Sequence, residues 1–549
     1  MRPLTPPEIS LPPDISKLFV LPSVTPTEGL PLLLDFGIIA SYFLIVLFIG
    51  LWSRVGKDVT PDQYFLSSRS LKWPSIAIST IATNIHAGHF VGMTGSAYLY
   101  GLAQANLEIN AIFGIVIATL FFVPLFLRQR VTTITQFLEN KLGPYVALAY
   151  SSFMILLYGF LFMGSALFWA SYAIDGLFGE LIGTSALAPP WRLFALAIVL
   201  AAFSAFYTYL GGLRAVVRTD VVQFVLLLGG GLVTVFFAIK ELGGWPELWS
   251  QTGQLMHLHL PRDHEALPWT GLFGMILLNL NYWGANQVIL QRALAAKDLR
   301  QAQIGLLVGG AVKYVMVVIV IVPGIALAGI LRDDPLEDPD QAYLTLVKTL
   351  LPVGLRGLVL CGLFASLMST VDSIYNSVST MWSVDIYKRH LRPEASNSQM
   401  VRAARVAMVG TMLCGLAFAF MMINAKLGSQ SSAFTHWFNE LSYYVKNGFV
   451  LLILAAVLLI KPARALVLIV LISSGLLYYV LSLAFPAMNY FVRSGWVIVA
   501  SFAIVAIPTV YKNGWRLPEG NFVEVSHPRV GHFALALLAS LVFCHIVFH

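Results

Sequence analysis

Residues 77–95, AISTIATNIHAGHFVGMTG, place groups that bind ions and polar solutes inside an apolar stretch. Asn84, His86 and His89 stand there together with several glycines, which weaken a helix. Unwound backbone at membrane depth is tolerated only where protein or a water-filled cavity satisfies its N–H and C=O groups. Two interpretations remain open from this stretch alone: a broken helix that binds a solute, as in secondary transporters, or a glycine-rich packing helix with two buried histidines.

Ionisable residues occur in other apolar stretches as well. Lys313 lies about nine residues into one of them, roughly 14 Å deep at 1.5 Å per residue. An ionisable side chain at that depth indicates either a functional site or a structural ion pair. Glu108 lies near the end of a predicted helix, close to the first break. Asp220 lies at the start of another helix, where the helix dipole favours an acid.

A stripe of hydroxyl groups follows the sequence ASLMSTVDSIYNSVST within 351–384. Ser366, Ser369, Thr370 and Ser373 recur at i, i+3, i+4 and i+7, so they share one face of a helix. Such oxygens can bind a small cation, or they can hydrogen-bond neighbouring helices. Asp372 in the same helix requires a cation, a proton or a hydrogen-bonding partner.

The composition is that of a polytopic membrane protein. The chain has 549 residues, of which 58% are hydrophobic and 11% charged, and its mean hydropathy is +0.78. The net charge of +7 is attributed to cytoplasmic loops and not to nucleic-acid binding. The three cysteines each lie in an apolar stretch at no metal-ligand spacing, so neither a disulfide framework nor a zinc site is expected.

About fourteen stretches are long enough to span a membrane. They are predicted at 33–52, 74–100, 105–127, 145–173, 192–210, 220–239, 269–290, 304–331, 351–384, 403–424, 433–460, 464–484, 494–511 and 531–548. Lys and Arg residues, Arg292 among them, concentrate in alternate loops, whereas the loop 333–340 on the other side is acidic. The positive-inside rule then predicts a multi-pass protein of the plasma (inner) membrane with both termini outside.

A second interrupted stretch, LLNLNYWGANQ at 277–287, follows the first after five predicted helices. Paired broken spans at corresponding positions indicate inverted repeats. The predicted units are an irregular leader at 1–30, a flanking helix and inner loop at 31–73, a first repeat at 74–240, an outer loop at 241–268, a second repeat at 269–460 and C-terminal flanking helices at 461–549.

Four motifs resemble the sodium:solute symporter family, most closely its sodium/sugar cotransporters. They are NIHAGHFVG (84–92), YLGGLRAVVRTDVVQ (209–223), NQVILQRALAAKDLRQAQIG (286–305) and LMSTVDSIYNSVSTMWSVDIYK (367–388). The resemblance covers nearly the whole hydrophobic chain. It implies an all-α fold of the LeuT type, which has a five-plus-five inverted repeat and flanking helices.

The resemblance also implies binding residues. Sodium would be bound by the carbonyls of Ala82, Ile85 and Ser366 and by the hydroxyls of Ser369 and Thr370. The hydroxyl groups of a sugar would be met by Asn84, His89, Glu108, Asn279 and Lys313, and Tyr282 would form an inner gate beside Trp283. Asp220, Asp372 and Ser373 form a possible second cation site, with a structural hydrogen bond at Asp372 as the alternative.

Four features depart from the family pattern. His86 replaces a small residue, and Leu161 and Phe162 stand where an amide is expected. An ungapped alignment places Asn439 at a position that is usually Gln, and it adds Asn439 to the expected solute site. Lys446 replaces part of a Gly-Pro-Pro break. These departures leave the cation site intact and concern the solute.

We therefore expect a symporter that couples sodium to the import of a sugar or sugar-like polar solute. The alternative is sodium-coupled symport of another polar solute, such as a polyol, an amino acid or a carboxylate. An enzyme is not expected, because His86 and His89 lack the third metal ligand or the nucleophile that a catalytic site needs. The expected partners are a small solute and the lipid bilayer, without nucleic acid.

Overall fold

The computed structural model describes residues 30–54, 56, 59–178, 187–428, 434–514 and 523–549. The predicted leader 1–30 therefore lies almost wholly outside the described residues. Within them, β-type pairing is confined to two isolated bridges, Leu71–Ala296 and Leu260–Pro268. Helices form nearly everything else, so the prediction of an all-α fold is confirmed.

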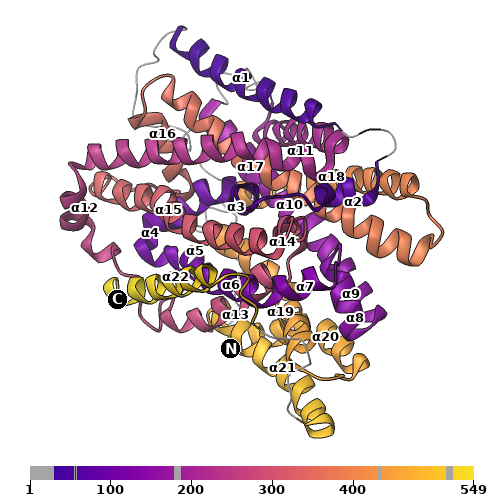
Figure 1. Cartoon of the computed structure of the whole chain (residues 1–549). Coiled ribbons are helices and arrows are strands. Elements are labelled where there is room, and N and C mark those ends of the chain that lie inside the picture. Colours follow the sequence, from indigo (N-terminus) through magenta and orange to yellow (C-terminus); the bar gives the residue numbers. More distant parts are fainter. Residues whose placement is uncertain (1–29, 55, 57–58, 179–186, 429–433, 515–522) are drawn as a thin grey trace, which may run out of the picture.

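The helices follow one another along the chain as a single bundle (Figure 1). The first part comprises α1 (Leu30–Trp52), α2 (Pro61–Leu66), α3 (Trp73–Asn84), η3 (His89–Met93), α4 (Thr94–Tyr100), η4 (Gly101–Ala105), α5 (Asn106–Ile109), α6 (Ala111–Ile117), η5 (Ala118–Phe122), α7 (Val123–Arg128), α8 (Ile134–Leu142), α9 (Pro144–Leu156), η6 (Leu157–Phe162), α10 (Met163–Phe178) and α11 (Pro189–Leu242). The second part comprises α12 (Trp245–Thr252), α13 (Leu272–Gly284), α14 (Gln287–Leu294), α15 (Leu299–Ile330), η10 (Pro339–Gln341), α16 (Ala342–Leu350), α17 (Leu355–Met381), η11 (Trp382–Leu391), α18 (Asn397–Gly428) and α19 (Phe434–Leu458). The C-terminal helices are α20 (Arg464–Ala484), α21 (Tyr490–Asn513) and α22 (Pro528–Val547).

Eleven stretches of the described residues are long and apolar enough to cross a membrane. The difference from fourteen has a structural reason. The expected spans 192–210 and 220–239 are the two arms of one long element, α11, and together form a single stretch. The second part of 74–100 continues into 105–127, and 269–290 is divided between shorter helices. The number fourteen stays a prediction.

A kink divides α11 at Gly212, whose φ of 56° and ψ of −148° are open only to glycine. A Cβ at this position would also lie 2.5 Å from the backbone oxygen of Tyr64. The two arms of α11 therefore take different directions and meet at a residue whose backbone angles are not helical.

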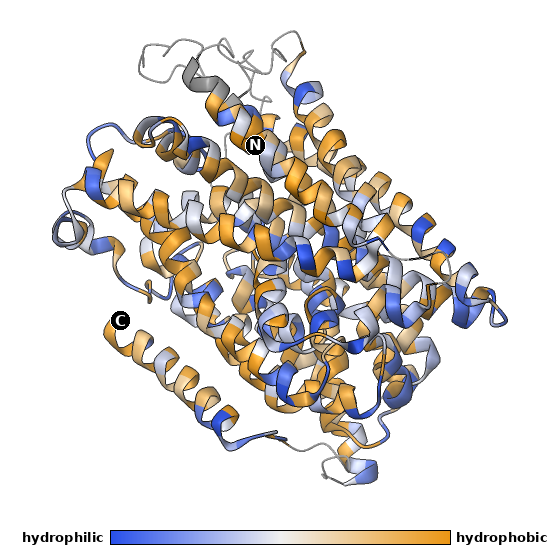
Figure 2. Cartoon of the chain, turned by 45° about the horizontal axis from the view of Figure 1, so that its top comes forward, coloured by the Kyte–Doolittle hydropathy of each residue, from blue (hydrophilic) through white to orange (hydrophobic). Residues whose placement is uncertain are grey.

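Apolar side chains cover both the inside and the outside of the bundle, as expected for helices that are hydrophobic all round. Hydrophilic residues gather in the connecting loops (Figure 2). Phe48 on α1 is 69% exposed and Ile507 on α21 is likewise 69% exposed, which suits side chains that face lipid.

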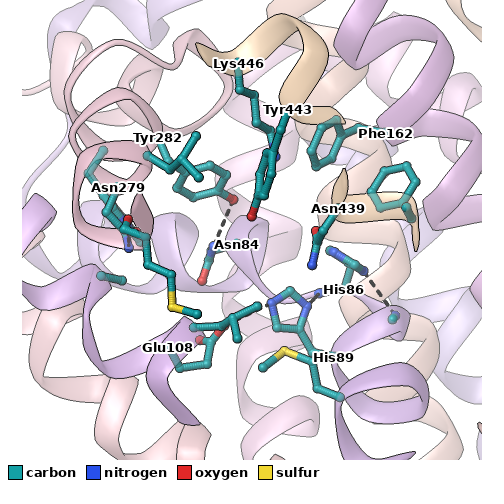
Figure 3. A pocket seen from close by; sticks show the side chains of 18 of the residues that line it. Asn84, His86, His89, Glu108, Phe162, Asn279, Tyr282, Asn439, Tyr443 and Lys446 are labelled. Carbon is teal, nitrogen blue, oxygen red and sulfur yellow. Dashed lines mark hydrogen bonds and ion pairs between the residues drawn. The ribbon is translucent and has the colours of Figure 1, made fainter. Parts of the chain in front are cut away.

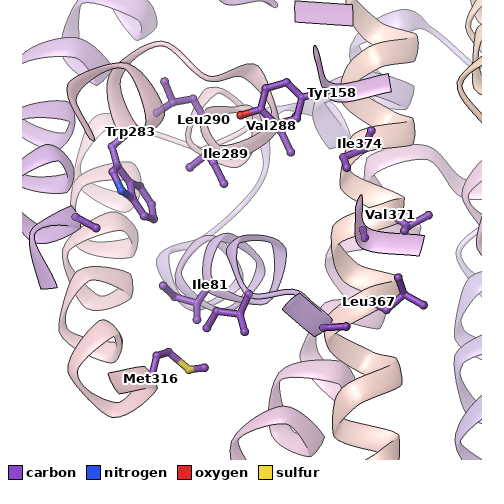
Figure 4. Packing of buried hydrophobic residues seen from close by; sticks show 14 of the residues in the cluster. Ile81, Tyr158, Trp283, Val288, Ile289, Leu290, Met316, Leu367, Val371 and Ile374 are labelled. Atoms are coloured by element: carbon purple, nitrogen blue, oxygen red, sulfur yellow. The ribbon is translucent and has the colours of Figure 1, made fainter. Parts of the chain in front are cut away.

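The centre of the bundle is formed where α3, α14, α15 and α17 meet. Ile81, Ile289 and Val371, from three of these helices, belong to one buried cluster (Figure 4). This packing fixes the position of the polar ends of α3 and α13, which carry the site described next.

Candidate functional site

The first predicted break is present between Asn84 and His89. In a continuous helix the amide groups of His86 and His89 would donate to the carbonyls of Ala82 and Ile85. Instead, the His86 N–H donates to Nδ1 of His89 over 3.2 Å, and the His89 N–H donates to the His86 carbonyl over 2.8 Å. The break therefore frees the two carbonyl oxygens that the family resemblance assigned to sodium.

Helix α17 packs its hydroxyl stripe against this break. Thr370 Oγ1 donates to the carbonyls of Thr83 and Ser366, each over 3.1 Å. Ser366 Oγ donates to the Leu363 carbonyl over 2.8 Å. Ser366, Ser369 and Thr370 are all buried, so the predicted sodium residues of α17 lie in the interior beside α3.

Asp220 on α11 is the centre of a buried polar network. Its carboxylate accepts hydrogen bonds from Ser369, over 2.5 Å, and from Ser79. Arg292 on α14 is completely buried and lies 3.9 Å from the same carboxylate. Arg292 also donates to Ser373.

The charge pattern predicted Arg292 in a positively charged inner loop, and this prediction is wrong. The side chain points inward because α14 follows directly after the second break and is buried along its whole length. Its place in NQVILQRAL, soon after the break, was the only available signal.

Asp372 on α17 has hydrogen-bond donors of its own on α11. Its carboxylate accepts hydrogen bonds from three hydroxyl groups of α11: Ser204, Tyr207 and, over 3.1 Å, Thr208. Asp220 and Ser373 thus share one network through Arg292, whereas Asp372 has its own set of donors. The second cation site predicted for these residues stays a prediction.

A cavity of about 160 Å³ lies beside the two breaks (Figure 3). The second break separates α13 from α14 at Ala285 and Asn286. All eight residues predicted for the solute and the gate line this cavity, namely Asn84, His89, Glu108, Asn279, Tyr282, Trp283, Lys313 and Asn439. The structure therefore brings together residues from five separate parts of the chain.

Lys313 holds the polar end of the cavity together. Its ammonium donates to Glu108 over 2.5 Å and to the side-chain oxygen of Asn84. The amide of Asn84 donates in turn to the Tyr282 hydroxyl over 2.9 Å. His89 Nε2 lies 3.3 Å from the second oxygen of Glu108. Lys313 is 1% exposed and Glu108 7%, so this ion pair is almost fully removed from solvent.

Other residues of the cavity wall were not assigned to the site from the sequence. Trp169, Phe162 and Tyr443 supply aromatic surface, and His86 and Lys446 supply polar groups. Phe162, His86 and Lys446 had been recognised as departures from the family pattern, and that was the signal that could have placed them in the site.

The comparison with protein families agrees with this arrangement. A model described as the sodium:solute symporter family matches residues 64–461. The chain belongs to this family. It is therefore a membrane transporter and not an enzyme, and sodium is its coupling ion.

Relatives within the family carry sodium-coupled functions in their names. The sodium/glucose cotransporter of Vibrio parahaemolyticus is 31% identical over 434 residues, which cover 72% of this chain and 78% of that protein. The sodium/glucose cotransporter 4 of Mus musculus is 32% identical over 73% of this chain and 62% of its own length. The sodium/myo-inositol cotransporter 2 of Homo sapiens is 30% identical over 76% of this chain and 65% of its own length. The chain thus spans less than two thirds of these two mammalian proteins.

A solved structure confirms the fold class. The substrate-bound, outward-open state of a Na⁺-coupled sialic acid symporter superposes with a TM-score of 0.73, covering 87% of this chain and 98% of that one. The two sequences are 18% identical, so the likeness concerns the fold alone. The predicted LeuT-type arrangement is confirmed.

Proposed function

We propose that this protein is a symporter that couples sodium to the import of one small, sugar-like polar solute. The observation that carries the proposal is the cavity between the two broken helices, which collects every residue expected to bind the solute. Its volume lies below the roughly 300–1,000 Å³ typical of sites for drug-sized ligands, which favours a single sugar ring.

Sodium would be held where the break in α3 faces α17. The expected ligands are hard oxygen atoms, which suit a small cation. They are the freed carbonyls of Ala82 and Ile85, the carbonyl of Ser366 and the hydroxyls of Ser369 and Thr370. Because these ligands come from two helices, ion binding depends on the position of α3 relative to α17. The ion would therefore brace α3 against α17 and complete the solute site beside it.

The solute would bind on the other side of the same break. Asn84, Glu108 and Lys313 present both hydrogen-bond donors and acceptors, which matches the mixed character of sugar hydroxyl groups. Asn279, His89 and Asn439 extend this polar surface. The ring of Tyr282 would cover the solute as a gate.

The gradient supplies enough energy for concentrative uptake. One ion that crosses about 100 mV releases about 2.3 kcal/mol. A tenfold sodium gradient adds about 1.4 kcal/mol, and the sum supports a solute ratio of several hundred. The proposal includes a location in the plasma (inner) membrane with both termini outside.

Counterflow in proteoliposomes tests the proposal. Proteoliposomes that contain the purified protein are loaded with one sugar or polyol from a panel. Uptake of the labelled solute is then compared in sodium and in choline. We expect uptake of at least one sugar-like solute to require sodium. Failure of sodium to stimulate uptake of any solute would refute the proposal.

A further inference from the structure

One wall of the cavity is formed by a single face of α19. Asn439, Tyr443 and Lys446 recur at i, i+4 and i+7, which places them on one side of the helix. All three line the cavity. In the view of Figure 3, Lys446 lies across the cavity from Glu108 and His89. The cavity thus has a cationic side chain at the end away from the Lys313–Glu108 pair.

The two lysines of the cavity differ in their partners. Lys313 is matched by Glu108, 2.5 Å away. His89 accepts the His86 N–H at Nδ1, and its Nε2 lies towards Glu108. The Lys446 ammonium lies over the rings of Phe162 and Tyr443, at 4.6 and 5.2 Å. No carboxylate oxygen of the described residues lies within 4.0 Å of it. The described part of the cavity therefore contains one lysine that has no acidic partner within ion-pair distance.

His86 adds a neutral donor to the same space. Its Nδ1 accepts the Gly88 N–H over 3.1 Å, so the ring proton resides on Nε2. Gly88 permits this arrangement, because a Cβ there would lie 2.7 Å from the His86 ring and 2.8 Å from Trp169. His86 is thus held with its remaining nitrogen available as a donor in the cavity wall.

An unmatched ammonium at membrane depth is costly, and a neutral sugar would leave it unmatched. Aromatic faces compensate a cation only partly. A carboxylate on the solute would cancel the charge, whereas a phosphate group, at about −1.5 to −2, would introduce excess negative charge.

We propose that the solute is a sugar acid, a single ring with one carboxylate that pairs with Lys446. This inference rests on the proposed function and specifies the solute class of the same site. The hydroxyl groups of the ring face Asn84, Glu108 and Lys313. His86 and Asn439 are placed to donate to the carboxylate.

Competition in the wild-type protein provides the first test. Sodium-dependent counterflow is measured against glucuronate, galacturonate, the parent hexoses and glucose 6-phosphate. We expect a uronate to compete at least tenfold more strongly than its parent hexose and than the phosphate. A hexose or the sugar phosphate that competes as well as the uronates would overturn the inference.

Substitution of Lys446 provides the second test. Lys446→Met should weaken uronate binding at least tenfold and change hexose binding less than threefold, whereas Lys446→Arg should retain most of the uronate preference. Lys240→Met is the matched control, because Lys240 is exposed at the end of α11. Equal loss of uronate and hexose binding in Lys446→Met, in protein with the wild-type elution profile, would also overturn the inference.

Charge movement gives a readout independent of affinity. For a sugar acid, the net charge moved equals the sodium flux minus the solute flux, whereas for a neutral sugar it equals the sodium flux. For the best solute we expect the net charge to equal the sodium flux minus the solute flux. A net charge equal to the sodium flux would contradict a solute that carries a carboxylate. Sodium-driven uptake of neutral sugars alone would refute this inference but preserve the proposed function. Absence of sodium stimulation for every solute would refute the proposed function itself.

Discussion

The ion pair between Lys313 and Glu108 allows structural and functional roles to be separated. At an effective dielectric constant of about 20, unit charges 2.5 Å apart attract by about 7 kcal/mol. Desolvation of both ions offsets part of this, and removal of one partner from a buried pair costs about 3–5 kcal/mol. Glu108→Gln and Lys313→Met should each lower stability by this amount, because each leaves one buried charge unmatched.

The double variant Glu108→Gln/Lys313→Met contains no unmatched charge. Its stability should therefore recover most of the loss, so that the two substitutions are strongly non-additive. Transport should be lost in all three variants, because each lacks at least one of the two charged groups expected to meet the solute. This contrast between recovered stability and lost transport is the core of the prediction.

Apparent Tm in detergent and sodium-dependent counterflow are the two measurements. With an unfolding entropy of about 2.1 cal/mol/K per residue, a loss of 3–5 kcal/mol corresponds to roughly 3–4 °C for a chain of 549 residues. The control is Glu139→Gln, which removes a pair with Arg389, whose side chain is 59% exposed. This surface pair should contribute less than about 1 kcal/mol. A double variant as unstable as the sum of the single variants would refute the coupling, and restored transport would show that neither residue binds solute.

Three further predictions concern sodium and pH. Ser369→Ala and Thr370→Ala should each raise the sodium concentration for half-maximal uptake at least about tenfold, because a bond to a charged group contributes about 1.5–3 kcal/mol; unchanged values would exclude these hydroxyls as ligands. If a second cation is coupled, more than one charge should cross the membrane per neutral sugar transported, and this ratio should fall towards one in Asp220→Asn. A wild-type ratio of one would contradict a second cation. Burial raises the pKa of Asp340, in η10, from 3.8 to about 6, so its contribution to stability is present below about pH 4 and is lost as the pH rises through about 6. Asp340→Asn should therefore flatten the change of apparent Tm between about pH 4 and 6, and an identical slope in the variant would contradict this assignment.

Much of the candidate site was predictable because its signals are local. Two histidines, an amide and glycines in an apolar stretch identified the first break, and LLNLNYWGANQ identified the second. The hydroxyl stripe of α17 followed from helical periodicity alone. These features depend on neighbours within one or two turns, which the sequence displays directly.

The pairing of charged residues was harder to predict from the sequence. Lys313 and Glu108 are 205 residues apart in the chain, and Ser204 and Asp372 are 168 apart. Such pairs depend on the rotation and tilt of whole helices, which are set by packing against neighbours. The burial of Arg292 was mispredicted for the same reason.

Local sequence patterns were thus sufficient to identify the class of membrane protein, the two breaks and the residues that could bind ions or solute. Which of these residues meet depends on how the helices pack. Packing of α3 against α17 brings freed carbonyls to hydroxyl groups. Packing of α15 beside the first break brings Lys313 to Glu108, and packing of α19 places Lys446 in the cavity wall without an acidic partner among the described residues. A break in a helix is a local property of the backbone, whereas the charge balance of a cavity is the sum over side chains that only the folded bundle assembles.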